Sequence, residues 1–112
     1  MDMERREEIE RFSVYWVDLN PTKGSEIKKT RPCIVVSPDE LNKHLNTVIV
    51  VPLTSTIRNY PFRVGCLVAD TEGEAAIDQI RTVDKSRIEK YISSLRKSEI
   101  QQIKEVLRQM FE

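Results

Sequence analysis

Four basic residues lie within nine positions near the start of the chain, and together they could hold a phosphate group. They are Lys23, Lys28, Lys29 and Arg31. A guanidinium presents planar donors that match two phosphate oxygens, and lysine ammonium groups add point charges. The alternative is a solvated loop in which Arg31 forms an ordinary salt bridge, for instance with Glu26. Composition alone favours this alternative.

Thr54 directly follows the apolar run of residues 48–53, so its hydroxyl is expected to emerge at the margin of a sheet. Pro52 in the same run indicates a bulge or a bend. A hydroxyl at this position can donate to a phosphate oxygen. The alternative is that Thr54, Ser55 and Thr56 form a turn that only ends the strand. Taken alone, the run of hydroxyls favours the turn.

Asp78 and Gln79 interrupt the apolar-leaning segment EAAIDQIRTV at residues 74–83. A carboxylate in such a segment needs a cationic partner, and Arg81 and Arg31 are the candidates. A catalytic base and a structural ion pair would both place an acid here. The segment therefore contributes Asp78 as a candidate without deciding its role.

The histidine and cysteine residues do not form a metal-binding pattern. His44 is the only histidine, and it lies in a short predicted helix without an acidic residue spaced to orient it. Cys33 and Cys66 both lie in apolar runs outside any Cys-x-x-Cys pattern, which favours packed thiols in a reducing compartment over a disulfide. We therefore expect no bound metal and no cofactor.

The composition describes a globular domain whose net charge is zero. The 112 residues include 18 basic and 18 acidic side chains, and 39% of the residues are hydrophobic. An acidic lead-in at residues 1–10 contains five acids and two bases, so residues 11–112 carry a small basic excess. Neutrality speaks against strong non-specific binding of nucleic acid, but it leaves room for a local phosphate site. No apolar run approaches the length of a membrane span.

The positions of proline, glycine and apolar residues divide the chain into short elements. Two capping boxes, Ser37 with Glu40 and Ser98 with Gln101, mark the starts of two helices. Because the strands are mostly consecutive, we expect an α+β, mostly β domain built on an antiparallel, strongly curved sheet or small barrel with its helices outside. The predicted elements are strands at 14–19, 33–37, 47–53, 62–69 and 74–83, an exposed mobile loop at 20–30, helices at 38–45 and 99–111, and either a helix or a strand at 88–95.

Three strings of the sequence resemble the MazF/PemK (Kid) family of toxin ribonucleases. They are VYWVDLNPTKGSEIKKTRPCIVVS, VVPLTS and AIDQIRTVDKSRI. The resemblance covers residues 12–107 in the order and spacing of the family, and residues 1–10 fall outside it. The pieces D-L-N-P-x-x-G-S-E, T-R-P and D-Q-I-R-T-V-D are specific as a set.

The resemblance implies a small SH3-like barrel of the CcdB/PemK type with outer helices, including a C-terminal helix, as one toxin domain over residues 11–112. It implies a cytoplasmic homodimer that cleaves single-stranded RNA at specific sequences through the ribose 2′-OH, without a metal. A cognate antitoxin would neutralise it. Neither a membrane nor specific recognition of double-stranded DNA is expected.

The resemblance also assigns roles to residues. The active-site positions of the family fall on Arg31 in T-R-P and Thr54 in P-L-T-S, and Asp78 matches a further acidic residue. The loop at 20–30 resembles the mobile loop that borders the RNA groove and is displaced or covered by antitoxin. The candidate RNA-binding residues are Glu26, Lys28, Lys29, Ser55, Gln79 and Arg81.

Two departures from the family restrict the mechanism that can be carried over. Thr30 stands where some members have a histidine, and Ala76 stands where others have an arginine. An imidazole or second-arginine mechanism therefore does not transfer, whereas an arginine–threonine mechanism does. The alternatives are a CcdB-type toxin that inhibits a topoisomerase without nuclease activity, and a non-enzymatic SH3-like binding module.

Overall fold

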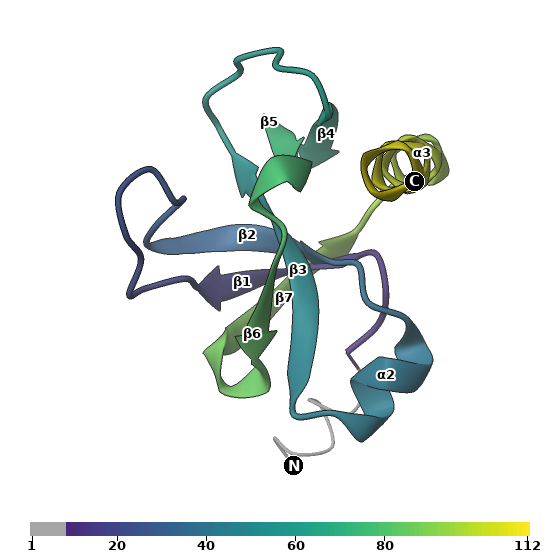
Figure 1. Ribbon diagram of the computed structural model, residues 1–112. Coiled ribbons are helices and arrows are strands. Elements are labelled where there is room, and N and C mark those ends of the chain that lie inside the picture. The colour runs from purple at the N-terminus through teal and green to yellow at the C-terminus, as the bar shows by residue number, and fades with distance from the viewer. Residues whose placement is uncertain (1–8) are drawn as a thin grey trace.

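The apolar runs form one strongly curled antiparallel sheet, which a computed structural model describes together with its helices for residues 9–112 (Figure 1). The mostly β domain with a C-terminal helix that we expected is confirmed. The strands are β1 (Ser13–Asp18), β2 (Thr30–Val35), β3 (Thr47–Thr54), β4 (Arg63–Val68), β5 (Thr71–Ala76), β6 (Arg81–Asp84) and β7 (Ile88–Ser94). The helices are α2 (Asp39–His44) and α3 (Lys97–Phe111), with the 3-10 turns η1 (Ile77–Gln79) and η2 (Lys85–Arg87).

Strand β3 lies at the centre of the sheet because it bonds to neighbours along both edges. The strand order is β4-β5-β3-β2-β1-β7, and β6 also pairs with β3. One edge of β3 carries β2, whereas the other carries β6 along its first half and β5 at its end. A strand paired on both edges and covered on both faces needs a continuous apolar sequence, which explains the run from Val48 to Leu53.

The sheet separates two hydrophobic cores, because alternate residues of β1 and β3 point to opposite faces. Val14 and Val51 belong to the core that α3 covers. Val17 and Val50 belong to the second core, which the curl of β1, β2, β3 and β6 encloses. Leu19, at the end of β1, is fully buried in this second core, so the loop that follows starts from a fixed point.

The predicted strand at 74–83 is wrong as a single element, because η1 interrupts it. Leu53 pairs with Ala75 in β5, and Val50 pairs with Arg81 in β6. Between these two pairs β3 advances by three residues, whereas the segment that leads from β5 to β6 advances by six. The three extra residues form η1 at the edge of β3. Hydrophobic pattern alone could not reveal this, because the apolar residues continue through the turn: Ala76 and Ile77 are buried, and Ile80 packs against the same core.

The predicted capping box at the start of α2 is also wrong. The residue that precedes α2 is Pro38, and no side chain caps the helix. The Ser37 hydroxyl instead donates to Asn42 Oδ1 at 2.6 Å and accepts from the Ile49 N–H at 3.0 Å. Ser37 therefore joins α2 to β3, and this buried link uses the hydroxyl that we expected to cap the helix.

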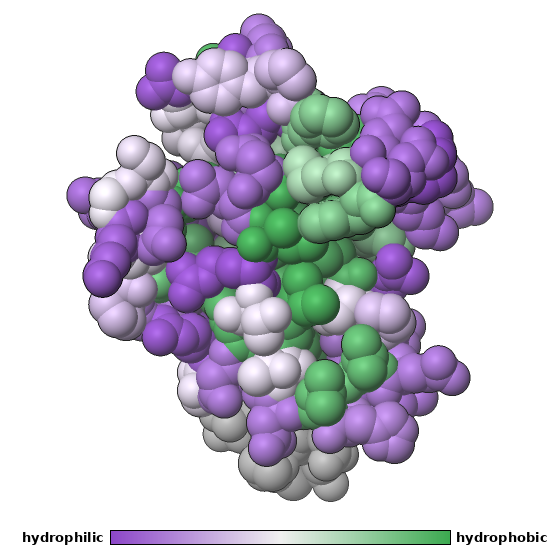
Figure 2. Space-filling view, in the orientation of Figure 1, coloured by the Kyte–Doolittle hydropathy of each residue, from purple (hydrophilic) through white to green (hydrophobic). Residues whose placement is uncertain are grey.

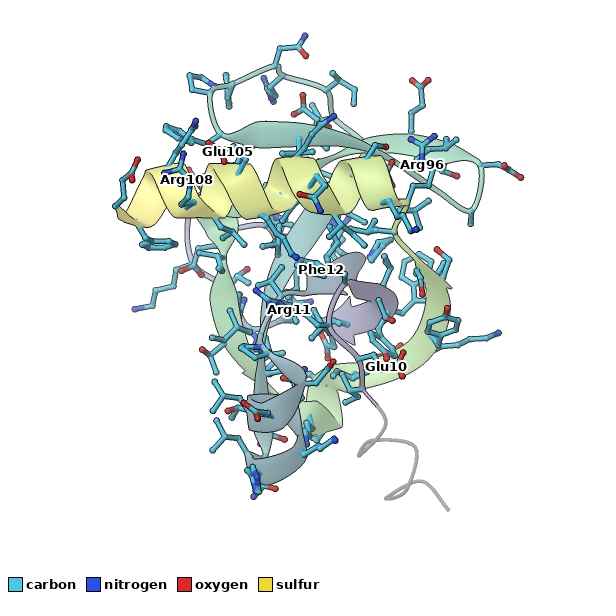
Figure 3. All side chains as sticks on the ribbon, turned by 90° about the vertical axis from the view of Figure 1, so that its right-hand side faces the viewer. Glu10, Arg11, Phe12, Arg96, Glu105 and Arg108 are labelled. Carbon is cyan, nitrogen blue, oxygen red and sulfur yellow. The ribbon has the colours of Figure 1, made fainter. Side chains whose placement is uncertain are left out.

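Helix α3 begins two residues earlier than expected, so Ser98 with Gln101 does not cap it. Arg96 precedes the helix, and Glu99 accepts from the Arg96 backbone N–H at 3.1 Å. The helix turns an apolar face to the sheet: Ile103 is fully buried, and Val106 packs against the same core. Figure 3 shows α3 crossing one face of the molecule, with Arg96 near its start, Arg108 near its end and Phe12 beneath it.

Two other expectations are settled by strand pairing. Segment 88–95, left open as helix or strand, is strand β7, which pairs with β1. Strand β2 starts at Thr30, so Pro32 lies inside it and faces Trp16 of β1. The ladder between β2 and β3 ends at Cys33, so a residue without an N–H at Pro32 removes no bond to β3.

Residues 1–8 lie outside the described residues, and the acidic lead-in over residues 1–10 stays a prediction. Ile9 is buried in the second core, and the Glu10 N–H donates to the Tyr15 hydroxyl at 3.3 Å. Among the described residues, no helix is long and apolar enough to cross a membrane.

Gly73 provides the first test of the fold. A Cβ atom built on Gly73 would lie 2.8 Å from the Thr54 carbonyl oxygen, whereas one built on Gly65 of the same hairpin meets no atom within 4 Å. We expect Gly73→Ala to lower the free energy of unfolding by about 1–3 kcal/mol through this overlap. The control Gly65→Ala should change it by less than about 0.5 kcal/mol. Urea unfolding measures both, and equal values for the two variants would contradict the close approach.

Glu99 provides a second test, through pH. Burial alone would raise the pKa of Glu99, but hydrogen bonds from Arg96 and from the Leu67 N–H hold it below the ordinary value of 4.5. The ionised carboxylate therefore adds stability above its unfolded pKa, and this contribution is lost as the pH falls through the lower folded pKa. We expect Glu99→Gln to lower the free energy of unfolding at neutral pH by about 1.5–3 kcal/mol and to weaken its dependence on acid. Urea unfolding of the wild type and of Glu99→Gln at several pH values measures this. Equal losses of unfolding free energy in the two proteins as the pH falls would contradict the expectation.

Candidate functional site

Strand register sets Arg31 and Thr54 at the same end of neighbouring strands. The β2–β3 ladder pairs Ile34 with Val51 and ends at Cys33 with Pro52. Arg31 lies two residues before Cys33 and Thr54 two residues after Pro52, so both stand just beyond the end of this ladder, where β3 pairs with β5. Both residues are half-buried. The two residues that the family resemblance assigns to the active site therefore lie at the same end of these strands, where β2 begins and β3 ends. We refer to this end as the edge that holds Arg31 and Thr54.

Arg81 adds a second guanidinium to this region from β6. Arg81 pairs with Val50 of β3, and its Nη1 donates to the Leu19 carbonyl at 3.1 Å. Burial raises the pKa of the Cys33 thiol to about 12, while the nearby charges of Arg81 and Arg31 act in the opposite direction. The two guanidinium groups thus lie on the same face of the sheet around one buried thiol.

The arginines around the 20–30 loop are bound to backbone carbonyls rather than to carboxylates. Arg31 Nε donates to the Lys28 carbonyl at 3.0 Å, and Arg87 Nη1 donates to the Asp18 carbonyl at 3.1 Å. The ion pairs found within residues 9–112 involve Arg63, Arg96 and Arg108 instead. A carbonyl orients a guanidinium without cancelling its charge. The positive charge of the loop region is therefore available to an anion.

The salt bridge that we considered between Glu26 and Arg31 is absent from the part of the chain that the structure describes. Glu26 Oε1 accepts from the Lys23 N–H at 2.7 Å, which closes a turn inside the loop. Lys28 and Lys29 are exposed in the same loop. Figure 2 shows hydrophilic residues over the side where this loop lies, beside an apolar strip along the centre of the face.

Gln79 of η1 holds the 20–30 loop against the sheet. Its Oε1 accepts from the Ile27 N–H at 3.2 Å, and its Nε2 donates to the Ser25 carbonyl at 3.5 Å. The far end of the loop is fixed by the Leu19 N–H, which donates to the Lys29 carbonyl at 3.1 Å. The Gln79 side chain thus joins η1 to the 20–30 loop.

Thr54 forms the turn that was one of its two alternatives, and its role as a phosphate donor stays a prediction. Its hydroxyl oxygen accepts from the Thr56 N–H at 3.2 Å, so Thr54 does form a turn with the residues after it. The hydroxyl hydrogen is a separate donor, and it can still be directed at a phosphate oxygen. Ser55 follows as an exposed residue at the start of the loop between β3 and β4.

Asp78 is paired with Arg63, and the predicted partners Arg81 and Arg31 are wrong. Arg63 Nε and Nη2 donate to the two Asp78 carboxylate oxygens at 2.8 and 3.2 Å. The hydrogen bond from Arg63 is the largest cause that holds the pKa of Asp78 below its ordinary value. A carboxylate with a lowered pKa and two occupied oxygens is a weak proton acceptor.

Arg63 and Glu74 were missed by sequence reasoning. Arg63 Nη1 also donates to Glu74 Oε1 at 3.4 Å, and Glu74 is a buried carboxylate within β5. An acid inside a predicted strand was a signal that could have found it, because a buried carboxylate needs a partner. Its partner became visible only with the register of the β4–β5 hairpin, in which Arg63 lies opposite Ala76.

Comparison with known proteins gives the same fold over nearly the whole chain. The structure superposes on the crystal structure of MazF from Deinococcus radiodurans with a TM-score of 0.82 at 23% sequence identity, covering 91% of this chain and 94% of that one. It superposes on a mycobacterial endoribonuclease in complex with its cognate antitoxin with a TM-score of 0.77 at 26% identity, covering 90% and 92%.

Sequence comparison gives relatives of the same kind. The chain is 38% identical over 68 residues to the endoribonuclease toxin MazF of Escherichia coli, a match that spans 61% of each protein. It is 35% identical over 111 residues to the endoribonuclease MazF9 of Mycobacterium tuberculosis, covering 89% of this chain and 93% of that one.

The family model described as PemK-like, MazF-like toxin of type II toxin-antitoxin system matches residues 10–111. This match takes in every described strand and both described helices, together with the edge that holds Arg31 and Thr54. The chain therefore belongs to the PemK-like, MazF-like toxins of type II toxin–antitoxin systems.

Proposed function

We propose that this chain is a sequence-specific endoribonuclease that cleaves single-stranded RNA with Arg31 and Thr54, without a metal ion. The observation that carries the proposal is the placement of these two residues at one end of β2 and β3, with Arg81 on the same face. The relatives that are named as endoribonucleases support it. The described residues contain no cluster of acids, histidines and cysteines that could hold a metal ion.

Cleavage at a ribose requires three things of the protein. The 2′-oxygen must lose its proton and attack the adjacent phosphorus, the negative oxygens of the five-coordinate phosphorane must be stabilised, and the departing 5′-oxygen must gain a proton. Arg31 suits the second task, because its charged fork can meet the developing oxygens. Thr54 can donate to the same phosphate from the neighbouring strand.

Removal of the 2′-proton is the step that the described site supports least. Arginine side chains have a pKa above about 12, so a guanidinium is a poor base. Arg63 occupies both carboxylate oxygens of Asp78, which weakens Asp78 as a proton acceptor. We assign Arg31 to the phosphorane and the leaving oxygen, and we leave the proton to Glu26 or to water. In this assignment Asp78 acts as an anchor for η1.

The surface around the 20–30 loop also suggests which molecules the chain binds. A type II system supplies an antitoxin, and the mycobacterial relative was solved with its own. We propose that a cognate antitoxin covers or displaces the 20–30 loop, whose exposed Lys28 and Lys29 border Arg31. We also propose that two copies form a homodimer in the cytoplasm, and that Ser55, Gln79 and Arg81 contact the RNA strand.

Replacement of Arg31 tests the assignment of the site. We expect Arg31→Ala to lower the rate of RNA cleavage by about 100-fold or more, because the phosphorane loses its cationic donor. Cleavage of a long transcript by the purified protein, followed on a gel, measures the effect. The matched control is Arg108→Ala, which removes an exposed arginine on α3 that pairs with Glu105 and Glu112. Full activity of Arg31→Ala in a folded protein would overturn the assignment.

The chemistry of the substrate provides a separate test. Cleavage sites are first mapped by sequencing the ends of a digested transcript, in the presence of EDTA. A short RNA that carries one mapped site should be cut, and the same RNA with a single 2′-deoxyribose at that site should remain intact, because the attacking oxygen is missing. Cleavage of the deoxy substrate would contradict the mechanism. Intact RNA together with blocked DNA supercoiling would favour the CcdB-type alternative, and neither effect would favour a binding module.

A further inference from the structure

Glu74 fastens the loop between β3 and β4 to the body of the domain. Its two carboxylate oxygens accept from the Arg58 N–H at 3.1 Å and from the Asn59 N–H at 2.8 Å. Burial alone would raise the pKa of Glu74, but the hydrogen bonds from Arg58, Asn59 and Arg63 hold it below the ordinary value. Glu74 is therefore a charged, buried acceptor for two successive amides of a loop that has no regular structure of its own.

Arg63 extends this attachment from the loop to η1. The same guanidinium binds Glu74 through Nη1 and Asp78 through Nε and Nη2, and it lies 5.1 Å from the centre of the Tyr60 ring. The side chains of Arg63 and Glu74 are only 9% and 4% exposed. We call Arg63, Glu74 and Asp78 the carboxylate–arginine clamp. It joins the 55–62 loop to η1, two segments that are separated along the chain.

The clamp connects to the 20–30 loop through η1. Asp78 is bound by Arg63, and the next residue, Gln79, is the one that holds the 20–30 loop. Hydrogen bonds thus link the 55–62 loop, η1 and the 20–30 loop into one connected set, which we call the wall. Arg58 and Ser55 belong to the 55–62 loop, which directly follows Thr54, and both are exposed, so both are accessible to an RNA strand.

The reacting groups do not depend on the clamp for their own positions. Arg31 is fixed by its ladder with Val17 of β1 and by its bond to the Lys28 carbonyl. Thr54 is fixed by its backbone pairing with Glu74, which a change of the Glu74 side chain leaves in place. Loss of the clamp should release the wall and leave the chemical step nearly intact.

We propose that Arg63 and Glu74 are positioning residues that hold the 55–62 loop and η1 in place to bind the RNA strand that flanks the cut. This inference rests on the proposed ribonuclease function. It assigns to the clamp the binding of RNA, measured by KM, and not the chemical step, measured by kcat.

The test compares the wild-type protein with the variants Glu74→Gln and Arg63→Lys, each as the full chain. KM and kcat are measured on a short RNA that carries one mapped cleavage site. In Glu74→Gln the side-chain NH₂ group replaces one of the two oxygens that now accept from backbone N–H groups, so one acceptor is lost. In Arg63→Lys the single ammonium group cannot bind both carboxylates in the forked geometry of a guanidinium. In each variant we expect KM to rise about tenfold while kcat changes by less than about twofold. Amide exchange at Arg58 and Asn59 should become faster in Glu74→Gln.

The matched control is Glu99→Gln, because Glu99 is also a buried carboxylate that binds an arginine and a backbone N–H, but on the α3 side of the domain. It should lose stability and keep the wild-type KM. The inference is overturned if KM stays within about twofold of wild type in both clamp variants, or if Glu99→Gln raises KM equally. Failure of the wild-type protein to cut RNA, or full activity of Arg31→Ala, would instead overturn the proposed function.

Discussion

The shared use of strand β3 is the constraint on which the rest of the molecule depends. Its backbone is bonded to β2 along one edge and to β6 and β5 along the other. Because β6 and β5 do not continue the same register, the chain between them must form the three-residue turn η1. Asp78 and Gln79 stand at this turn, so the ion pair with Arg63 of β4 and the hydrogen bonds to the 20–30 loop both originate in a mismatch of strand pairing.

The separation of cations into two groups explains how a neutral protein can present a positive site. Arg63, Arg96 and Arg108 are paired with carboxylates and serve the fold. Arg31 and Arg81 bind main-chain carbonyls, which fix their direction while their charge remains. A net charge of zero disfavours non-specific binding of nucleic acid, whereas in the proposed site Arg31 and Arg81 would supply the cations for one phosphate.

The strands and the last helix could be predicted because hydrophobic periodicity is a local property. The pairing of Arg31 with Thr54 as one site was expected from the family resemblance alone. The physical reason that they lie at the same end of β2 and β3 is the register of these strands, which no local pattern contains. The predicted capping box at the start of α2 was wrong because the Ser37 hydroxyl instead donates to Asn42 and accepts from Ile49 of β3, and the second contact is not local in sequence. The pairing of Asp78 with Arg63 likewise depends on how the hairpin folds back, so sequence reasoning chose the wrong arginines.

The two buried thiols bear on the chemical durability of the molecule. Cys33, beside the arginines of the site, and Cys66, in β4, are both free and buried, and burial raises the pKa of each to about 12. Oxidants and alkylating agents attack the thiolate, which at such a pKa is almost absent at neutral pH. Because both thiols are also shielded from solvent, neither Cys33 nor Cys66 is expected to be a ready target for such reagents.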